Sequence, residues 1–119
     1  MENKGELVLL LYDGAIGFIS RALEAVEAGR KDEGTRLILR TQAVISALKD
    51  ALDMRYEVAQ SLGELYDYFN RRLVEANNDK ASLALCEVRA YLEDLRETWA
   101  EAATRVERAD AQGVAGVRG

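Results

Sequence analysis

The residues best suited to chemistry are two tyrosine–aspartate pairs, Tyr12-Asp13 and Tyr66-Asp67, each placed within an apolar stretch. Each aspartate could accept a hydrogen bond from a backbone or tyrosine group, or could simply be solvated, and the residues alone leave both roles open. A tyrosine at the edge of an apolar stripe typically buries its ring and keeps its hydroxyl in water, and we expect this of both tyrosines.

Histidine is absent from all 119 residues, and this removes several kinds of site. A phosphotransfer bundle needs a phospho-accepting histidine, a di-iron bundle needs paired Glu-x-x-His motifs, and serine or cysteine nucleophiles usually need a histidine base. Zinc sites rely on histidine or on several cysteines, whereas this chain has one cysteine. Carboxylate chemistry remains, but the apolar stripes described below contain no Asp or Glu. We therefore expect no enzyme, no cofactor and no metal.

Composition indicates one all-α domain. Hydrophobic residues make up 49% of the chain, which suffices for a core, and proline is absent. The net charge of −5 disfavours binding to nucleic acid or to an anionic membrane, and no apolar run is long enough to span a bilayer. Cys86 has no partner for an internal disulfide, which suits a reducing cytoplasm, and we expect it to be partly exposed.

Apolar residues recur at helical spacing in four segments, which predicts helices at about residues 6–28, 32–53, 57–76 and 80–109. Gly29 is expected to end the first helix and Asp32 to cap the second. Short connections make sequential helices antiparallel neighbours, so we expect an antiparallel up-down-up-down four-helix bundle over residues 1–109. Residues 110–119 read as a flexible glycine-rich tail. The predicted core stripes are Leu7, Leu11, Gly14, Phe18, Ala22 and Ala25; Leu37, Ile38, Thr41, Val44, Ile45, Leu48 and Leu52; Val58, Leu62, Leu65, Phe69, Leu73 and Ala76; and Leu85, Val88, Leu92, Leu95, Trp99, Ala102 and Val106.

The first helix has more apolar surface than one core stripe requires. At 100° per residue, Leu9, Tyr12, Ile16 and Leu23 share a second face, and Ile19 bridges the two faces. One interpretation is that this helix is central and covered on both sides. The other is that the second face is a groove for a partner's amphipathic helix, or a homodimer seam.

The same segments resemble a known family. Residues 7–15 read Leu-Val-Leu-Leu-Leu-Tyr-Asp-Gly-Ala, which is similar to the first-helix signature of the flagellin export chaperones, the FliS family. Residues 62–68 and 71–77 resemble that family's third helix and the turn after it. Residues 51–53 resemble the end of its second helix, and residues 92–99 the end of its fourth. The match runs in order over about residues 6–102.

The resemblance implies a cytoplasmic bacterial chaperone with a four-helix bundle, no catalysis and no cofactor. Such a chaperone binds the disordered C-terminal segment of flagellin, which becomes helical as it wraps the bundle. Polymerisation is blocked until export through the flagellar type III apparatus, where the loaded complex docks on the export gate. The expected partner-binding residues are Leu9, Tyr12, Ile16, Ile19, Leu23, Leu39, Tyr66 and Asn77.

Two points remain open in this interpretation. Family members usually carry a tyrosine-containing segment before the first helix, whereas residues 1–5 alone precede the match here, so a truncated N-terminus is one interpretation. The alternative function is a non-catalytic adaptor or a structural bundle that forms a weak homodimer through the spare face. Binding to the flagellin C-terminal segment discriminates between these two functions.

Overall fold

The computed structural model describes residues 4–76 and 81–118, with side chains for residues 5–76 and 81–105. Four helices form most of these ranges. No strand occurs in these ranges. The helices are α1 (Lys4–Glu27), α2 (Lys31–Asp50), α3 (Glu57–Glu75) and α4 (Ala81–Arg118). The all-α prediction of four helices is therefore confirmed.

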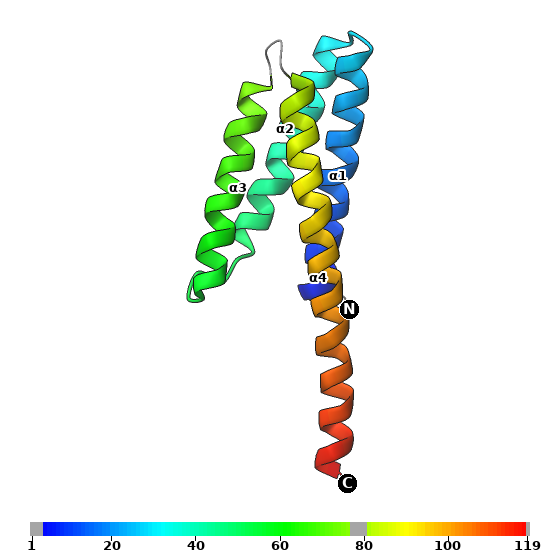
Figure 1. Cartoon of the computed structure of the whole chain (residues 1–119), viewed down its shortest axis with the longest axis vertical. Coiled ribbons are helices and arrows are strands. Elements are labelled where there is room, and N and C mark those ends of the chain that lie inside the picture. Colours follow the sequence, from blue (N-terminus) through cyan, green and yellow to red (C-terminus); the bar gives the residue numbers. More distant parts are fainter. Residues whose placement is uncertain (1–3, 77–80, 119) are drawn as a thin grey trace.

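The helices form a four-helix bundle in which successive helices run in opposite directions (Figure 1). Both α1 and α3 pack against α2 and α4, so α1 and α3 occupy diagonal corners. Two hydrogen bonds show the opposed directions of α1 and α4. The Trp99 indole N–H donates to the Gly5 carbonyl (3.3 Å), while Arg89 donates to the Ser20 hydroxyl (3.5 Å), so residue numbers rise on one helix as they fall on the other.

The turn between α1 and α2 depends on Gly29, as the sequence predicts. Gly29 has a φ of 78°, a conformation that costs glycine little and other residues more. The Gly29 N–H donates to the Val26 carbonyl (3.1 Å), and the Arg30 N–H donates to the Ala25 carbonyl (2.8 Å). This pairing satisfies two carbonyls left over at the helix end. The N-cap prediction was wrong, because α2 is preceded by Arg30 and Asp32 lies inside its first turn.

The fourth helix is longer than predicted. It continues to Arg118 and leaves the bundle along most of its second half, so the segment beyond residue 109 is helical rather than an irregular tail (Figure 1). The few glycines there weaken a helix without forbidding one, since helix propensity is a small energy per residue. The end of α2 is at Asp50 rather than near Asp53. The other predicted helix ends lie within two residues of the observed ones.

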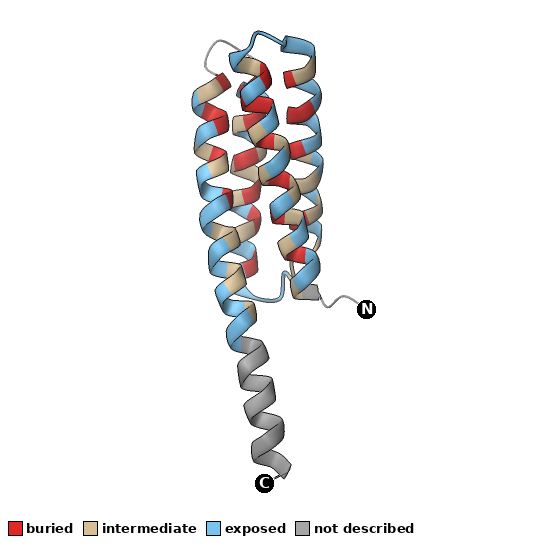
Figure 2. Ribbon diagram, turned by 90° about the vertical axis from the view of Figure 1, so that its right-hand side faces the viewer, coloured by how far each residue is buried: buried red, intermediate tan, exposed pale blue. Residues whose placement is uncertain are grey.

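The core lies along the inner faces of the four helices (Figure 2). The predicted stripe of α2 is buried except for Val44 and Leu52, which are half-buried. In the predicted stripe of α4, Leu95 and Trp99 are half-buried, and Ala102 was wrongly placed in the core because it is exposed. The side chain of Val106 lies outside the described residues. The buried members of the α4 stripe are Leu85, Val88 and Leu92. Beyond the predicted stripes, Ala59, Tyr66, Ala81 and Ala84 are also buried. Val58 was wrongly placed in the core, because its side chain is 69% exposed.

The core face of α1 differs from the predicted one along the first part of the helix, whereas Ala22 and Ala25 are buried as predicted. Leu7 is exposed, and Leu11, Gly14 and Phe18 are half-buried. The buried stripe consists of Val8, Tyr12, Ala15, Ile19, Ala22, Leu23 and Ala25. Small alanines such as Ala15 let neighbouring backbones approach closely, which favours this face as the contact face, whereas the predicted stripe placed Leu11 and Phe18 in the core.

Candidate functional site

The predicted partner-binding residues do not form one accessible face. Leu9 and Ile16 are half-buried, Leu39 is 58% exposed, and Asn77 lies outside the described residues. The remaining four are buried in the core, namely Tyr12, Ile19, Leu23 and Tyr66. The prediction of a groove along these four residues is therefore wrong for the free protein, because the other helices already cover their surface. The roles of Leu9, Ile16 and Leu39 in binding stay predictions.

Tyr12 and Tyr66 share a hydrogen bond between their hydroxyls at the centre of the bundle. Each side chain is 2% exposed, so the expectation that both hydroxyls contact water was wrong. Burial raises the pKa of Tyr66 above its usual range, and the Tyr12 hydroxyl raises it further. Burial also raises the pKa of Tyr12, although its hydrogen bond to Tyr66 opposes the change. Both groups are therefore neutral at physiological pH, and each satisfies the other's polar atom.

The two aspartates that follow these tyrosines form ion pairs between neighbouring helices. Asp13 on α1 accepts from Arg96 on α4 at 2.8 Å, and Asp67 on α3 accepts from Lys49 on α2 at 2.8 Å. Each tyrosine thus points into the bundle while its aspartate, 100° further round the helix, reaches the next helix. All four charged side chains are more than a third exposed, so these pairs contribute little stability. In the free protein, both tyrosine–aspartate pairs connect helices to one another.

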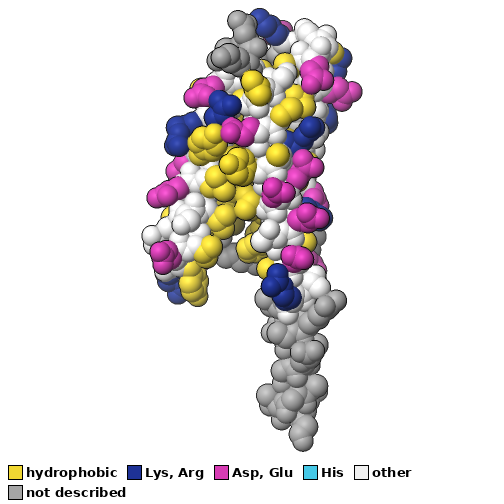
Figure 3. All heavy atoms as spheres, in the orientation of Figure 1, with side chains coloured by type: hydrophobic (Ala, Val, Ile, Leu, Met, Phe, Trp, Pro, Cys, Tyr) yellow, Lys and Arg dark blue, Asp and Glu magenta, His cyan; other side chains and the backbone are white. Residues whose placement is uncertain are grey.

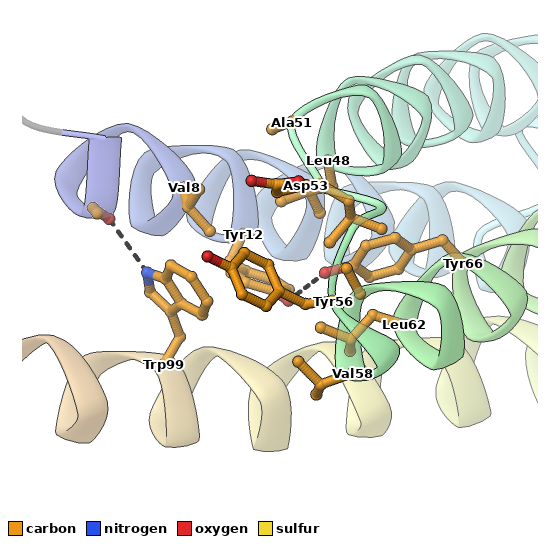
Figure 4. Close-up of a pocket in the computed structure, with 13 residues that line it drawn as sticks. Val8, Tyr12, Leu48, Ala51, Asp53, Tyr56, Val58, Leu62, Tyr66 and Trp99 are labelled. Carbon is orange, nitrogen blue, oxygen red and sulfur yellow. Dashed lines mark hydrogen bonds between the residues drawn. The ribbon is translucent and has the colours of Figure 1, made fainter.

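A cavity of about 360 Å³ lies at the open end of the bundle, and the tyrosine pair forms part of its wall (Figure 4). Side chains from all four helices and from the loop at residues 51–56 surround it. Its volume is within the range of about 300–1,000 Å³ that is usual for ligand sites. The lining is mostly apolar, and consists of Gly5, Val8, Tyr12, Leu48, Ala51, Leu52, Asp53, Tyr56, Val58, Ala59, Leu62, Tyr66 and Trp99.

An apolar groove continues from this cavity between α3 and α4. Figure 3 shows it as a hydrophobic strip that crosses the face of the molecule between the two helices. We call it the α3–α4 groove. Its members are exposed or half-buried large side chains, namely Val58, Leu62, Leu65, Tyr91, Leu95 and Trp99.

The groove is closed at the end far from the cavity. There the Glu87 carboxylate accepts hydrogen bonds from Tyr68 (3.0 Å) and Arg72 (2.7 Å), and the Phe69 and Tyr91 rings lie 5.5 Å apart. The hydrogen bond from Arg72 is the main reason that the pKa of Glu87 is lowered. Figure 1 shows α3 diverging from α4 towards the other end, where the cavity opens. The geometry offers a long apolar surface that deepens into a pocket.

This groove was not predicted from the sequence. Helical periodicity does not distinguish residues buried in a core from residues that line a groove. Val58, Leu62, Leu65, Leu95 and Trp99 all follow the spacing of a core stripe. They are left uncovered because α3 diverges from α4, and no local pattern reports the angle between two helices. The sequence does show an excess of apolar residues, but the prediction placed the spare apolar face on the first helix.

The described ranges also bear on metal sites and membrane spans. No group of three or more His, Cys, Asp or Glu side chains that could hold a metal ion occurs there. None of the described helices has the length and apolarity needed to cross a membrane. Cys86 is exposed, as expected.

Comparisons with known proteins agree on one family. The family model described as "Flagellar protein FliS" matches residues 1–106. The flagellar secretion chaperone FliS of Bacillus subtilis is 36% identical over 95% of this chain and 84% of its own length. FliSB of Pseudomonas aeruginosa is 34% identical over 82% of this chain and 79% of its own length, and FliS of Salmonella typhimurium is 35% identical over 79% and 72%. Both the family match and the identities extend over most of the chain, so this protein belongs to the FliS family of flagellar proteins.

Proposed function

We propose that this protein is a cytoplasmic flagellar export chaperone that binds the disordered C-terminal segment of flagellin. The proposal is supported by membership of the FliS family and by relatives named flagellar secretion chaperones. In this role it blocks premature polymerisation of flagellin and delivers it to the flagellar type III export apparatus, docking on the export gate when loaded. No catalytic step is required, since holding and releasing a partner is a binding equilibrium.

The observation that carries the proposal is the apolar α3–α4 groove with the cavity at its open end. A disordered segment can order on such a surface if the apolar area that it buries outweighs the entropy lost on folding. Each large apolar side chain inserted from the partner contributes about 1.5–3 kcal/mol when fully buried. An amphipathic helix presents such side chains at i, i+3, i+4 and i+7, which suits a groove between two helices.

Titration with a peptide from the flagellin C-terminus tests the proposal. We expect favourable enthalpy, unfavourable entropy and a negative heat-capacity change by calorimetry, because a disordered segment orders on an apolar surface. The circular dichroism of the mixture should show more helix than the sum of the components. Trp99 is the single tryptophan of the chain and lines the cavity, so its fluorescence should change on binding.

A pair of matched substitutions on α3 locates the binding surface. Val58→Asp places a charge in the groove, whereas Val74→Asp places the same charge at a position with nearly the same exposure, 69% against 63%. Both variants should fold, because both valines are largely in water. Val58→Asp should weaken peptide binding by about 2 kcal/mol or more, since the complex must bury an unpaired charge, and Val74→Asp should bind like the parent.

Two outcomes would contradict the proposal. One is a mixture whose spectrum is additive, with no heat released at several temperatures. The other is a concentration-dependent homodimer in sedimentation experiments that has no affinity for flagellin, which would indicate a structural bundle. Equal weakening by Val58→Asp and Val74→Asp would leave the chaperone role intact but move the binding surface away from the α3–α4 groove.

A further inference from the structure

Carboxylates border the α3–α4 groove on both sides along its open half. Figure 3 shows acidic side chains on either side of the hydrophobic strip. Glu57 directly precedes Val58, and Glu64 directly precedes Leu65, on the exposed side of α3. On α4, Asp94 directly precedes Leu95 and is also exposed. The apolar surface is therefore bordered by negative charge from both helices.

Two of these carboxylates lie at one level along the α3–α4 pair. The Phe69–Tyr91 ring contact and the Arg72–Glu87 ion pair set the register of α3 against α4. Continuing this register by whole turns towards the cavity brings Glu64 level with Asp94. Like charges at one level on opposite sides repel each other, and a cation placed between them would relieve that repulsion.

Neither carboxylate has an ion-pair partner among the described residues. The nearby arginines are engaged elsewhere, since Arg96 pairs with Asp13 across the α1–α4 interface. At the closed end of the groove Arg72 pairs with Glu87. At the cavity Arg55 pairs with Asp53. The open half thus presents uncompensated negative charge beside apolar surface.

We propose that the occupant of this groove is an amphipathic segment whose apolar stripe is flanked by Lys or Arg residues. The inference rests on the proposed function, and it specifies the chemistry of the flagellin segment that binds here. Its apolar side chains fill the groove and the cavity, while its basic side chains lie against Glu64 and Asp94. Complementary charge of this kind sets the specificity and the rate of association more than the final affinity.

Charge reversal at Glu64 and Asp94 tests the inference, with a control of equal net charge. The test variant is Glu64→Lys/Asp94→Lys, and the control is Glu24→Lys/Asp50→Lys, at exposed positions that lie outside the groove. At low ionic strength we expect the test variant to bind the flagellin peptide about tenfold more weakly than the parent, and the control within about threefold. The difference should shrink as salt is added, because the side chains are exposed.

Two synthetic peptides separate this inference from the proposed function. Both carry the same leucine stripe on a helix of about 20 residues, one flanked by lysines and the other by glutamates, and Trp99 fluorescence reports binding. The parent and the control variant should prefer the lysine peptide, and the test variant should lose that preference. Loss of flagellin binding with this preference retained would reject the proposed function alone. Equal binding of both peptides by the parent, or equal effects of the test and control variants, would overturn the inference.

Discussion

The hydroxyls of Tyr12 and Tyr66 hydrogen-bond to each other although their helices occupy diagonal corners of the bundle. The two residues lie 54 positions apart in the chain, and both side chains are almost completely buried. The bond connects α1 to α3 through the centre of the bundle, while α2 and α4 lie on either side. It also forms part of the wall of the cavity, so the tyrosine pair joins the core to the candidate site.

A double-mutant cycle should show strong coupling between the two tyrosines. Tyr12→Phe or Tyr66→Phe alone leaves one buried hydroxyl without its partner, which should cost about 1–3 kcal/mol of unfolding free energy. The double variant removes both hydroxyls and should be more stable than the sum of the single effects predicts. Urea denaturation of the four proteins measures the coupling, and additive effects would mean that the hydroxyls do not interact in solution.

The same pair predicts a loss of stability at alkaline pH. Burial raises the pKa values of both tyrosines in the folded protein. In the unfolded chain they titrate near pH 10, so the unfolded state loses these protons first. Their contribution is therefore complete below about pH 10 and decreases as the pH rises further. Between about pH 9 and pH 11, the free energy of unfolding should fall more in the parent than in Tyr12→Phe/Tyr66→Phe. An equal dependence of the unfolding free energy on pH in the two proteins would refute this prediction, because they share all other titrating groups.

The observed orientation of α1 can be tested with one charge on each face. Ile19 is completely buried, so Ile19→Asp should prevent folding, since an aspartate there has no partner. Leu10 is 54% exposed, so Leu10→Asp should leave the melting temperature within a few degrees of the parent. Thermal melts followed by circular dichroism measure both. Unfolding by Leu10→Asp with tolerance of Ile19→Asp would show that α1 packs through the face that carries Leu10.

Two glycine substitutions should change stability in opposite directions. Gly29→Ala forces alanine into a left-handed conformation and should cost about 1 kcal/mol. Gly17 lies within α1, and a methyl group added there would meet no atom within 4 Å. Gly17→Ala should therefore stabilise the protein by about 0.5–1 kcal/mol through helix propensity. Denaturant midpoints compare the two, and destabilisation by Gly17→Ala would show that the position needs its glycine.

Phe69 should be the most sensitive aromatic position outside the tyrosine pair. Its ring is completely buried and contacts the rings of Tyr66, Tyr68 and Tyr91. Phe69→Ala should cost about 3–5 kcal/mol, because it leaves a cavity that the helices cannot fill. Leu83→Ala, at a side chain that is largely in water, should change stability by less than about 0.5 kcal/mol. If both variants changed the unfolding free energy by a similarly small amount, the contact between α3 and α4 at Phe69 would not belong to the folded core.

The sequence by itself determined the four helices, the core stripe of α2 and the first part of the core stripe of α4. Their apolar residues repeat at helical spacing on one face, while the other face is mainly polar, so local pattern and burial agree. Gly29 was predictable for a similar reason, since the left-handed conformation that ends the helix is one that glycine adopts readily.

Only the tertiary structure decided which face of α1 is buried and where the accessible apolar surface lies. Helix α1 is apolar on two faces, and the choice between them depends on how closely α2 and α4 can approach its alanines. Likewise, Val58 and Phe69 share one stripe, yet one is exposed and the other buried because α3 diverges from α4. Such choices are set by contacts between residues far apart in the chain, which periodicity within a single helix does not encode.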